Sequence, residues 1–441
     1  MIPTSVIEEL LSYSEDSRIA LDSRKVSAGD VFVAIKGDIA DGNDFVEDAL
    51  SAGATRVFSS RPCTDPRVIT VHDTVELLME AAKEVMSRSH LKSRIAITGS
   101  NGKTTTKEIT AFLLSQLGKT FKTAGNLNTE IGLPLSLLEN RRELLSAKYG
   151  VFELGTNAKG DIRKLVDLVE PNLCVLLNVG TAHVGNFGGI DELLEEKLSI
   201  FESGKLSRAV LGGTDERLRK FAADMPVETR LFGRHDADFS IVDFSYDSGE
   251  TLLHFDCEGD RFVRLKGIWS LGQLMDLGAA YLVANFEGLE EPSIFLSDYK
   301  SPFRDRFSVE HLHGITLISD FYNSSLESWE SAIVSIEKLS HSRKIAVAGS
   351  ILEQGEEEAN THEKLGRLLG KFDMTILFNH DKAIEAASKY VEPSLITDSV
   401  EQLAEWLFEN VRKGDLVFLK ASRAVALERV HKAFVEMMRN V

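Results

Sequence analysis

Cysteine, positive charge and long apolar runs are all scarce in this sequence. Its 3 cysteines, Cys63, Cys174 and Cys257, are far apart in a chain of 441 residues and share no metal-ligand spacing, so they read as reduced structural thiols. Acidic residues outnumber basic ones by 68 to 50, and the formal net charge of −18 argues against a general nucleic-acid or anionic-membrane surface. No apolar run reaches the ~18 residues of a membrane span.

The chain also lacks internal repeats, low-complexity tracts and a recognisable secretory signal. Its first residues, MIPTSVIEELLSYSED, are acidic and amphipathic, whereas a signal peptide has a basic start and an apolar centre. The apolar content of 43% and the charged content of 27% are ordinary for a globular protein with sizeable cores. We expect a soluble, cytoplasmic monomer that binds small molecules and no nucleic acid.

Strands and helices alternate along most of the chain, which is typical of α/β domains. We predict a small N-terminal α/β unit at 1–90, a central P-loop-type domain with a parallel sheet at 91–297, and a C-terminal doubly wound, Rossmann-like domain at 298–441. Strands are expected at 31–37, 56–60, 67–71, 94–98, 148–154 and 173–179, an antiparallel meander at 239–265, and helices from the phosphate loop to Gly118, at 190–201 and at 273–286.

The stretch RIAITGSNGKTTTKE combines a strand, a loop with two glycines and the start of a helix. This order suits phosphate binding, because glycines let backbone N–H groups approach an anion and the helix N-terminus adds partial positive charge. Lys103 could reach the outer phosphates of a nucleotide, and the Thr104 hydroxyl could bind Mg²⁺. The spacing differs from the usual P-loop, whose first Gly would stand at Ile97, because here Gly99 is separated from Gly102 by two residues.

With that spacing, TGSNGKTTT resembles the ATP loop of the Mur ligase superfamily, whose members build the peptidoglycan peptide and whose relatives include folylpolyglutamate and cyanophycin synthetases. Further segments resemble motifs of the same family, in the same order. They are DSRKVSAGDVFVAIKGDIADGNDF, TAGNLNTEIGLPL, FELGTNAKGDI, NVGTAHVGNFGG, DFYNSSLES, AGSILEQGEEEANTHEKLG and KASRAVALE. Several unlinked motifs in one order make the resemblance specific and extend it along nearly the whole chain.

The resemblance implies binding sites for ATP and for a UDP-sugar peptide. For ATP it implies Thr98, Gly99, Ser100, Asn101, Gly102, Lys103, Thr104, Thr105, Asn126, Gln273, Arg306, Asp320, Tyr322 and Asn323. For the UDP-sugar it implies Ser23, Arg24, Lys36, Asp41, Gly42 and Asn43, and for the remainder of the substrate Asn128 and Thr129. Without the family, most of these would be ordinary loop or surface residues.

Glu153, His183 and Lys197 are implied as ligands of Mg²⁺ beside Thr104, and Lys103, His183 and Lys197 as catalytic residues. Glu153 ends an apolar strand, and a carboxylate at the carboxyl edge of a parallel sheet suits Mg²⁺. Lys197 alone would read as a solvated helix lysine, but in the family the Lys at this point is carbamylated by CO₂ and helps to hold a second Mg²⁺. Because carbamylation requires the neutral amine, the site would have to lower a pKa that is normally ~10.4.

FELGTN, DFYN and LEQGEEE…H favour the family branch that joins D-alanyl-D-alanine to UDP-N-acetylmuramoyl-tripeptide. The expected reaction is ATP-dependent amide formation through an acyl phosphate, and the C-terminal domain is expected to close over ATP. Two alternatives remain. One is a sibling ligase that adds a single amino acid to a UDP-muramyl or folate chain, and the other is a P-loop NTPase or switch that binds partners, which the string VSAGDVFVAIKG disfavours.

The chain departs from the family pattern at the segment that contacts adenine, which often reads His-Asn-x-x-Asn. In GQLMDLGAA, Gln273 and Asp276 stand at the two Asn positions. Gln273 could still pair with adenine through both ends of its amide, whereas an ionised Asp276 cannot donate a hydrogen bond.

Overall fold

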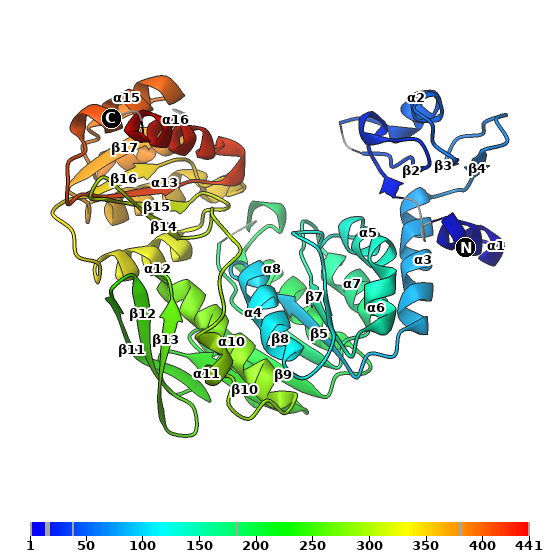
Figure 1. The fold of residues 1–441 in the computed structure, drawn as a ribbon, viewed down its shortest axis with the longest axis horizontal. Helices are drawn as coiled ribbons and strands as arrows, with labels where there is room; N and C mark the ends of the chain where they lie inside the picture. The colour runs from blue at the N-terminus through cyan, green and yellow to red at the C-terminus, as the bar shows by residue number, and fades with distance from the viewer. Residues whose placement is uncertain (1, 14–17, 38, 182–183, 379–381, 440–441) are drawn as a thin grey trace.

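The computed structural model of the chain describes residues 2–13, 18–37, 39–181, 184–378 and 382–439. They form three α/β units, each built on its own sheet, and the central unit lies between the other two (Figure 1). This confirms the predicted three-domain α/β architecture. Within the described residues, no helix is both long enough and apolar enough to cross a membrane.

The N-terminal unit contains a parallel sheet in the order β1-β2-β3-β4. Its elements, with η for a 3₁₀ helix, are α1 (Thr4–Tyr13), β1 (Ile19–Ala20), η1 (Ser23–Lys25), β2 (Val31–Val33), η2 (Gly42–Phe45), α2 (Val46–Ser51), β3 (Arg56–Ser59), β4 (Val68–Thr70) and α3 (Thr74–Arg88). Alternate side chains of β2 enter two cores: Phe32 packs with α2, while Val31 and Val33 pack with α3. Three strands lie where the sequence predicts them, each shorter than its apolar run.

The central unit holds a nine-stranded sheet in the order β13-β12-β11-β10-β9-β8-β5-β7-β6. Its elements are β5 (Ser93–Thr98), α4 (Lys103–Ser115), β6 (Thr120–Lys122), α5 (Gly132–Glu139), α6 (Arg141–Ser146), β7 (Tyr149–Glu153), α7 (Asp161–Val169), β8 (Leu173–Leu176), η3 (Val184–Asn186), α8 (Ile190–Leu198), η4 (Ser199–Glu202), β9 (Arg208–Gly212), α9 (Glu216–Ala223), β10 (Glu228–Gly233), β11 (Phe239–Asp247), β12 (Glu250–Asp256), β13 (Asp260–Lys266), α10 (Leu271–Phe286) and α11 (Ser293–Leu296). Strands β11 to β13 form the predicted antiparallel meander.

The carboxyl ends of β5, β7 and β8 lie along one edge of this sheet, because the three strands are parallel neighbours with β5 in the middle. The chain crosses from β5 to β6 and β7 on one side and to β8 and β9 on the other, so β5 marks a topological switch point. Open α/β sheets bind their ligands at such a point. Strand β8 ends at Leu176, so the predicted strand at 173–179 was too long and Asn178 belongs to the loop at this edge.

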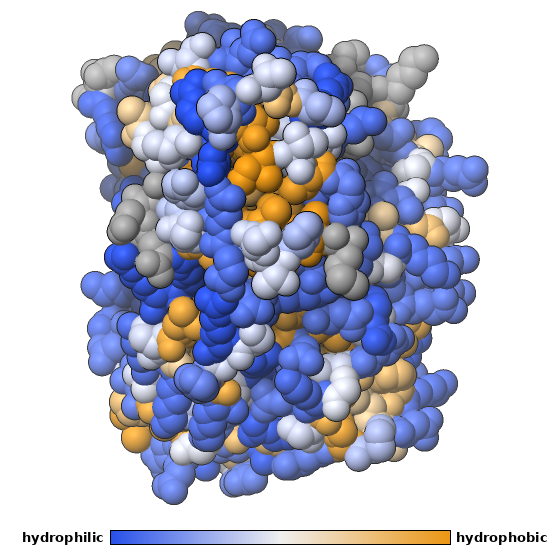
Figure 2. Space-filling model, turned by 90° about the vertical axis from the view of Figure 1, so that its right-hand side faces the viewer, coloured by the Kyte–Doolittle hydropathy of each residue, from blue (hydrophilic) through white to orange (hydrophobic). Residues whose placement is uncertain are grey.

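Helix α3 joins the N-terminal unit to the central unit through a shared apolar core. One buried cluster contains Phe58 from β3, Leu78 from α3, and Phe121 and Phe152 from β6 and β7, and α3 also contacts α5 and α7. A boundary at residue 90 therefore separates two sheets but divides one core, and it stays a prediction. Figure 2 shows the face on the N-terminal side, which is mainly hydrophilic, with apolar surface gathered in its upper half.

The C-terminal unit holds a sheet in the order β14-β15-β19-β16-β17-β18, in which all pairs are parallel except β14 with β15. Its elements are β14 (Ser308–Leu312), β15 (Ile315–Asp320), α12 (Leu326–Ile336), β16 (Lys344–Ala348), η5 (Gly355–Glu357), α13 (Glu358–Leu369), β17 (Met374–Phe378), α14 (Lys382–Glu385), η6 (Ala386–Lys389), β18 (Leu395–Thr397), α15 (Val400–Asn410), β19 (Leu416–Lys420), η7 (Arg423–Val425) and α16 (Glu428–Arg439). Ala346 and Val347 of β16 enter different cores, so the sheet is covered on both faces, as expected for a doubly wound domain.

Candidate functional site

The short glycine loop connects β5 to α4 as a tight turn. Gly102 is the residue before α4 and has φ of 86°, a left-handed conformation that favours glycine. A Cβ atom at this position would lie 2.0 Å from Oδ1 of Asp276 on α10. The turn thus needs glycine for its backbone and for its space. It brings the N-terminus of α4, with its unpaired N–H groups, to the switch point of the sheet.

The Lys103 side chain folds back over this loop. Its Nζ donates a hydrogen bond to the Gly99 carbonyl at 2.8 Å and lies 3.5 Å from the Ser100 carbonyl. Burial lowers the pKa of Lys103, with a further lowering from Arg306, while Glu153 acts in the opposite direction. An anion placed at this loop would offer the ammonium group the strong partner that the two carbonyl groups do not supply.

Glu153 ends β7 and is buried beside the loop. Its Oε1 accepts hydrogen bonds from the Thr104 hydroxyl at 3.2 Å and from Asn128 Nδ2 at 2.7 Å. Its Oε2 has no hydrogen-bond partner and lies 3.4 Å from Nζ of Lys107. A buried carboxylate oxygen without a hydrogen bond, next to a threonine hydroxyl, is a donor set that a hard cation such as Mg²⁺ would complete.

Lys107 is a residue that the sequence did not single out. It lies one turn into α4, is fully buried, and its Nζ donates to the Gly125 carbonyl at 2.5 Å. It therefore balances the charge of Glu153 and fixes the loop that carries Asn128. Its position on the buried face of α4, beside Thr106 and Thr110, is the local signal that could have indicated it.

Lys197 lies near the end of α8 and points into the same region, where only 2% of its surface is exposed. Burial lowers its pKa to about 7, and the positive charge of Lys103 adds to the lowering. The adjacent Glu196 acts in the opposite direction on this pKa. Its carboxylate accepts hydrogen bonds from Gly160 N at 2.6 Å, Ile162 N at 2.8 Å and the Thr156 hydroxyl at 3.1 Å. The sequence alone would indicate a solvated lysine, and that interpretation is wrong.

Two neighbouring cavities lie at this edge, between the central and C-terminal units. The first, of about 450 Å³, is called the Glu153 cavity, and the second, of about 430 Å³, lies between α10 and α12 and is called the α10–α12 cavity. The Glu153 cavity is lined by Ser100, Lys103, Thr104, Asn126, Asn128, Thr129, Glu153 and Lys197, among others. The α10–α12 cavity is lined by Thr105, Gln273, Asp276 and Asp320, among others. Asn101, Gly102, Arg306, Tyr322 and Asn323 line both, so the two cavities adjoin.

Arg306 connects the C-terminal unit to the phosphate loop. Its guanidinium donates to the Thr104 hydroxyl at 3.1 Å, and its carbon Cζ lies 3.7 Å from the centre of the Tyr322 ring. The Asp320 carboxylate pairs with the buried Lys420 at 2.6 Å, and Lys420 also donates to the Asn323 carbonyl. The predicted nucleotide residues of the C-terminal unit thus converge on the loop, with Asp320 held by a partner that the sequence analysis did not name.

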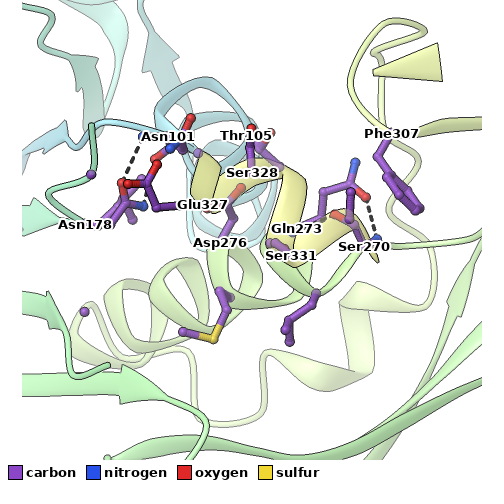
Figure 3. Close-up of a pocket in the computed structure, with 18 of the residues that line it drawn as sticks. Asn101, Thr105, Asn178, Ser270, Gln273, Asp276, Phe307, Glu327, Ser328 and Ser331 are labelled. Carbon is purple, nitrogen blue, oxygen red and sulfur yellow. Dashed lines mark hydrogen bonds between the residues drawn. The ribbon is translucent and has the colours of Figure 1, made fainter. Parts of the chain in front are cut away.

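Gln273 caps the start of α10, a role that the sequence analysis did not assign to it. Its Oε1 accepts from Ser270 N at 2.9 Å within a capping box, and its Nε2 donates to the Arg306 carbonyl at 2.9 Å (Figure 3). Each end of the amide therefore already has one partner, which leaves one lone pair of Oε1 and one N–H of Nε2 for a ligand such as adenine. The spacing Ser270-x-x-Gln273 is a known capping signal and was available in the sequence.

Asp276 projects from α10 toward Thr105 of the phosphate loop (Figure 3). Burial raises its pKa well above the usual range for a carboxyl group, whereas Arg306 and Lys103 act to lower it. The carboxyl group faces the N-terminus of α4, where nucleotide phosphates would lie. The protonated form of Asp276, which burial favours, could donate a hydrogen bond there, whereas the ionised form could not.

Two of the predicted nucleotide residues stay outside both cavity linings. Thr98 is fully buried, and its hydroxyl donates to the Leu154 carbonyl at 2.8 Å, which ties the ends of β5 and β7 together. Gly99 contributes its carbonyl to Lys103. His183, predicted as a catalytic residue and metal ligand, lies outside the described residues.

The six residues predicted for the UDP-sugar gather in the N-terminal unit, away from both cavities. Ser23 and Arg24 lie in η1, Lys36 pairs its backbone with Asp41, and Gly42 and Asn43 begin η2. Asn43 is buried and accepts hydrogen bonds from the Ser59 hydroxyl and Ser60 N, so it supports the fold of this loop.

Arg24 is largely exposed and pairs with Asp22 at 2.9 Å, whereas Arg61, which the sequence analysis passed over, pairs with Asp41 and Asp44. Whether these groups hold a nucleotide-sugar stays a prediction.

Comparison with known proteins gives matches along most of the chain. The Mur ligase family, catalytic domain matches residues 17–97, the Mur ligase middle domain residues 97–266, and the Mur ligase, glutamate ligase domain residues 305–423. The UDP-N-acetylmuramoyl-tripeptide–D-alanyl-D-alanine ligase of Bacillus subtilis is 31% identical over 431 residues, covering 95% of this chain and 93% of the relative.

Two solved structures share the whole fold. The MurF ligase from Thermotoga maritima in complex with ADP superposes with a TM-score of 0.89 at 34% identity, covering 98% of this chain and 99% of that one. MurF from Acinetobacter baumannii gives a TM-score of 0.84 at 25% identity, with 98% of each chain covered.

Proposed function

The chain belongs to the Mur ligase family, and on that premise we propose that it joins D-alanyl-D-alanine to UDP-N-acetylmuramoyl-tripeptide in peptidoglycan precursor synthesis. It is an ATP-dependent ligase that forms an amide bond. One observation carries the proposal: a phosphate loop, a buried carboxylate and a buried lysine of lowered pKa line one cavity under Arg306. The named relatives with this activity align with 93% or more of this chain.

Binding of ATP uses the loop and the residues of the C-terminal unit. The N-terminus of α4 and Lys103 would receive the phosphates, with Lys103 turning away from the Gly99 carbonyl toward the anion. Arg306, stacked on Tyr322, would complete the cationic side of the site and bring the C-terminal unit over the nucleotide. The ADP bound by the Thermotoga maritima relative supports this part of the proposal.

Mg²⁺ would be held by Thr104, Glu153 and, after carbamylation, Lys197. The buried Oε2 of Glu153 without a hydrogen bond fits this assignment. Among the described residues, no three His, Cys, Asp or Glu side chains group as metal ligands. A carbamylated Lys197 would add an anionic ligand beside Glu153. Reaction of the neutral Lys197 amine with CO₂ forms an N–C bond, releases a proton and creates that anion. Bound Mg²⁺ would supply charge neutralisation for the phosphates.

The reaction then proceeds in two steps. The terminal carboxylate of the UDP-tripeptide attacks the γ-phosphorus of ATP, which gives an acyl phosphate and ADP. The amine of D-alanyl-D-alanine attacks the acyl carbon, and phosphate leaves. Two anions meet in the first step, so the contribution of Lys103 and Arg306 is chiefly electrostatic. Seating of the C-terminal unit excludes water, which would otherwise hydrolyse the acyl phosphate.

Phosphate release tests the proposal. The protein is supplied with ATP and Mg²⁺, with and without UDP-N-acetylmuramoyl-tripeptide ending in lysine or diaminopimelate. Each mixture is tested with D-alanyl-D-alanine, with a single amino acid and with no amine, and the nucleotide-sugar is followed by mass. We expect release that requires both substrates, together with the mass gain of the dipeptide. Release without either would indicate an NTPase, and release with a single amino acid only would indicate a sibling ligase.

A further inference from the structure

Glu327, in the first turn of α12, joins the C-terminal unit to the loop that follows β8. Its Oε1 accepts a hydrogen bond from Thr181 N at 2.9 Å, and its Oε2 accepts one from the Thr181 hydroxyl at 3.3 Å. Both oxygens of one carboxylate are therefore used across the boundary between two units. In Figure 3 the Glu327 side chain lies beside Asn178 at the wall of the α10–α12 cavity.

Gly180, in the segment that Glu327 contacts, lies close to the Glu327 side chain. A Cβ atom at Gly180 would lie 2.8 Å from Cδ of Glu327, so glycine permits the approach. The Thr181 carbonyl faces the same unit, with Gln354 Nε2 at 3.5 Å. The C-terminal unit thus contacts Thr181 on both its N–H and its C=O side.

Charge also favours this contact. Arg217 of the central unit donates to the Val179 carbonyl at 2.8 Å, within the segment that Glu327 contacts. Its pKa is raised first by the Asp215 hydrogen bond, and then by Asp191 and Glu327. The position of Glu327 near the N-terminus of α12 is favourable for an anion as well.

The same segment continues to the phosphate loop. Ser100 N donates to the Asn178 carbonyl at 3.0 Å, and Gly180 N donates to Ser100 Oγ at 3.0 Å. Asn101 N donates to Asn178 Oδ1 at 2.9 Å. A displacement of residues 178–181 would therefore displace the loop that carries Lys103.

We propose that Glu327 is a positioning residue that fixes residues 178–181, and through them the phosphate loop, when the C-terminal unit is seated. It acts through Thr181 and has no assigned contact with the reacting atoms. This inference rests on the proposed ligase function for its effect on turnover, but the contact itself can be measured without any substrate.

The test compares the wild type with Glu327→Ala, Glu327→Gln and the control Glu330→Ala, which removes an exposed carboxylate from the next turn of α12. Hydrogen exchange of the peptide that contains Thr181 is measured in the substrate-free protein, and kcat and KM for ATP are measured in the ligation. For Glu327→Ala we expect exchange of that peptide about tenfold faster and kcat about tenfold lower, with KM within about threefold of the wild type, because a hydrogen bond to a charged acceptor is lost.

Glu327→Gln keeps an acceptor for Thr181 N and should restore both quantities to within about threefold of the wild type. The Glu330→Ala control should match the wild type. Unchanged exchange and unchanged kcat in Glu327→Ala would overturn the inference, and so would a raised KM with kcat unchanged, which would make Glu327 a nucleotide contact. If the wild type did not ligate, the proposed function would fall, and the exchange rates alone would decide the role of Glu327.

Discussion

The Arg306 guanidinium donates a hydrogen bond to the Thr104 hydroxyl at 3.1 Å, which places a cation of the C-terminal unit on the phosphate loop of the central unit. Because Thr104 also donates to Glu153, the three side chains form one chain from a cation to a buried anion. Nucleotide phosphates entering at α4 would therefore meet Arg306 and Lys103 together.

Arg306→Ala should lower kcat for the ligation by about 10²-fold, by analogy with other positioned charges that act on a transition state. Arg306→Lys keeps the charge but loses the planar contact with Tyr322, so it should recover no more than about a tenth of the lost rate. The measurement is initial phosphate release at saturating substrates. Arg304→Ala, which removes an exposed arginine two residues away, is the matched control and should retain wild-type turnover.

Lys197 should bind CO₂ as a carbamate, with a pH dependence set by its pKa of about 7. The neutral amine that reacts with CO₂ becomes more abundant as the pH rises through 7. With ¹³C-bicarbonate we therefore expect a carbamate NMR signal that grows from pH 6 to pH 8 and that is missing in Lys197→Ala. The exposed Lys159→Ala is the control. Full ligase activity of Lys197→Ala, with no response of either protein to bicarbonate, would refute the carbamate.

Asp276→Asn should stabilise the protein, and more so at higher pH. The folded state raises the pKa of this carboxyl group by burying it, so the folded state holds the proton more tightly than the unfolded state. With Asp276, the free energy of unfolding is therefore largest at low pH and falls as the pH rises through the folded pKa. Asparagine does not titrate, so the variant does not lose this free energy. Thermal unfolding at pH 5 and pH 8 measures this, and an equal shift at both pH values would show that Asp276 does not titrate in this range.

Glu196→Ala should destabilise the central unit by about 2–4 kcal/mol, since it leaves the Gly160 and Ile162 N–H groups and the Thr156 hydroxyl without their acceptor in a buried position. Glu195→Ala, from the exposed neighbouring position, should change stability by no more than about 0.5 kcal/mol. The midpoint of urea unfolding gives the comparison. A Glu196→Ala midpoint equal to that of the control would show that the loop has other means of holding these groups.

The architecture could be predicted because its signals are local. Apolar strands separated by helical segments predicted three α/β units. The short spacing between Gly99 and Gly102 predicted a tight turn before Lys103, and Gly102 has the left-handed backbone conformation that favours glycine. The placement of Glu153 followed from one rule, that the carboxyl ends of parallel strands meet at one edge. Most of the strands were shorter than predicted, because an apolar run continues into the loop, as Leu177 and Val179 do after β8. Strand β5 is the opposite case, since it begins one residue before the predicted range, at Ser93.

The environment of individual side chains could not be predicted from the sequence. Lys107 and Lys197 are the kind of residue that faces water on most helices. Their surroundings include Glu153, which pairs with Lys107, and Lys103, whose charge lowers the pKa of Lys197, and both come from distant parts of the chain. Arg306 lies near Thr104 only because two units meet. Gln273 is different, since its capping box is a local pattern that the family resemblance overshadowed.

The apolar core shared by β3, α3 and the central sheet has a mechanical consequence. The N-terminal unit cannot rotate relative to the central unit without breaking that core, so these two units behave as one rigid body. Residues 300–306 contain no helix or strand and lie between Tyr299 of the central core and Phe307 of the C-terminal core, so a rotation of the C-terminal unit would take place here. A nucleotide-sugar bound in the N-terminal unit would therefore lie at a fixed distance from the phosphate loop. The length of its peptide, rather than any movement of the N-terminal unit, would decide whether its tip reaches the phosphate loop.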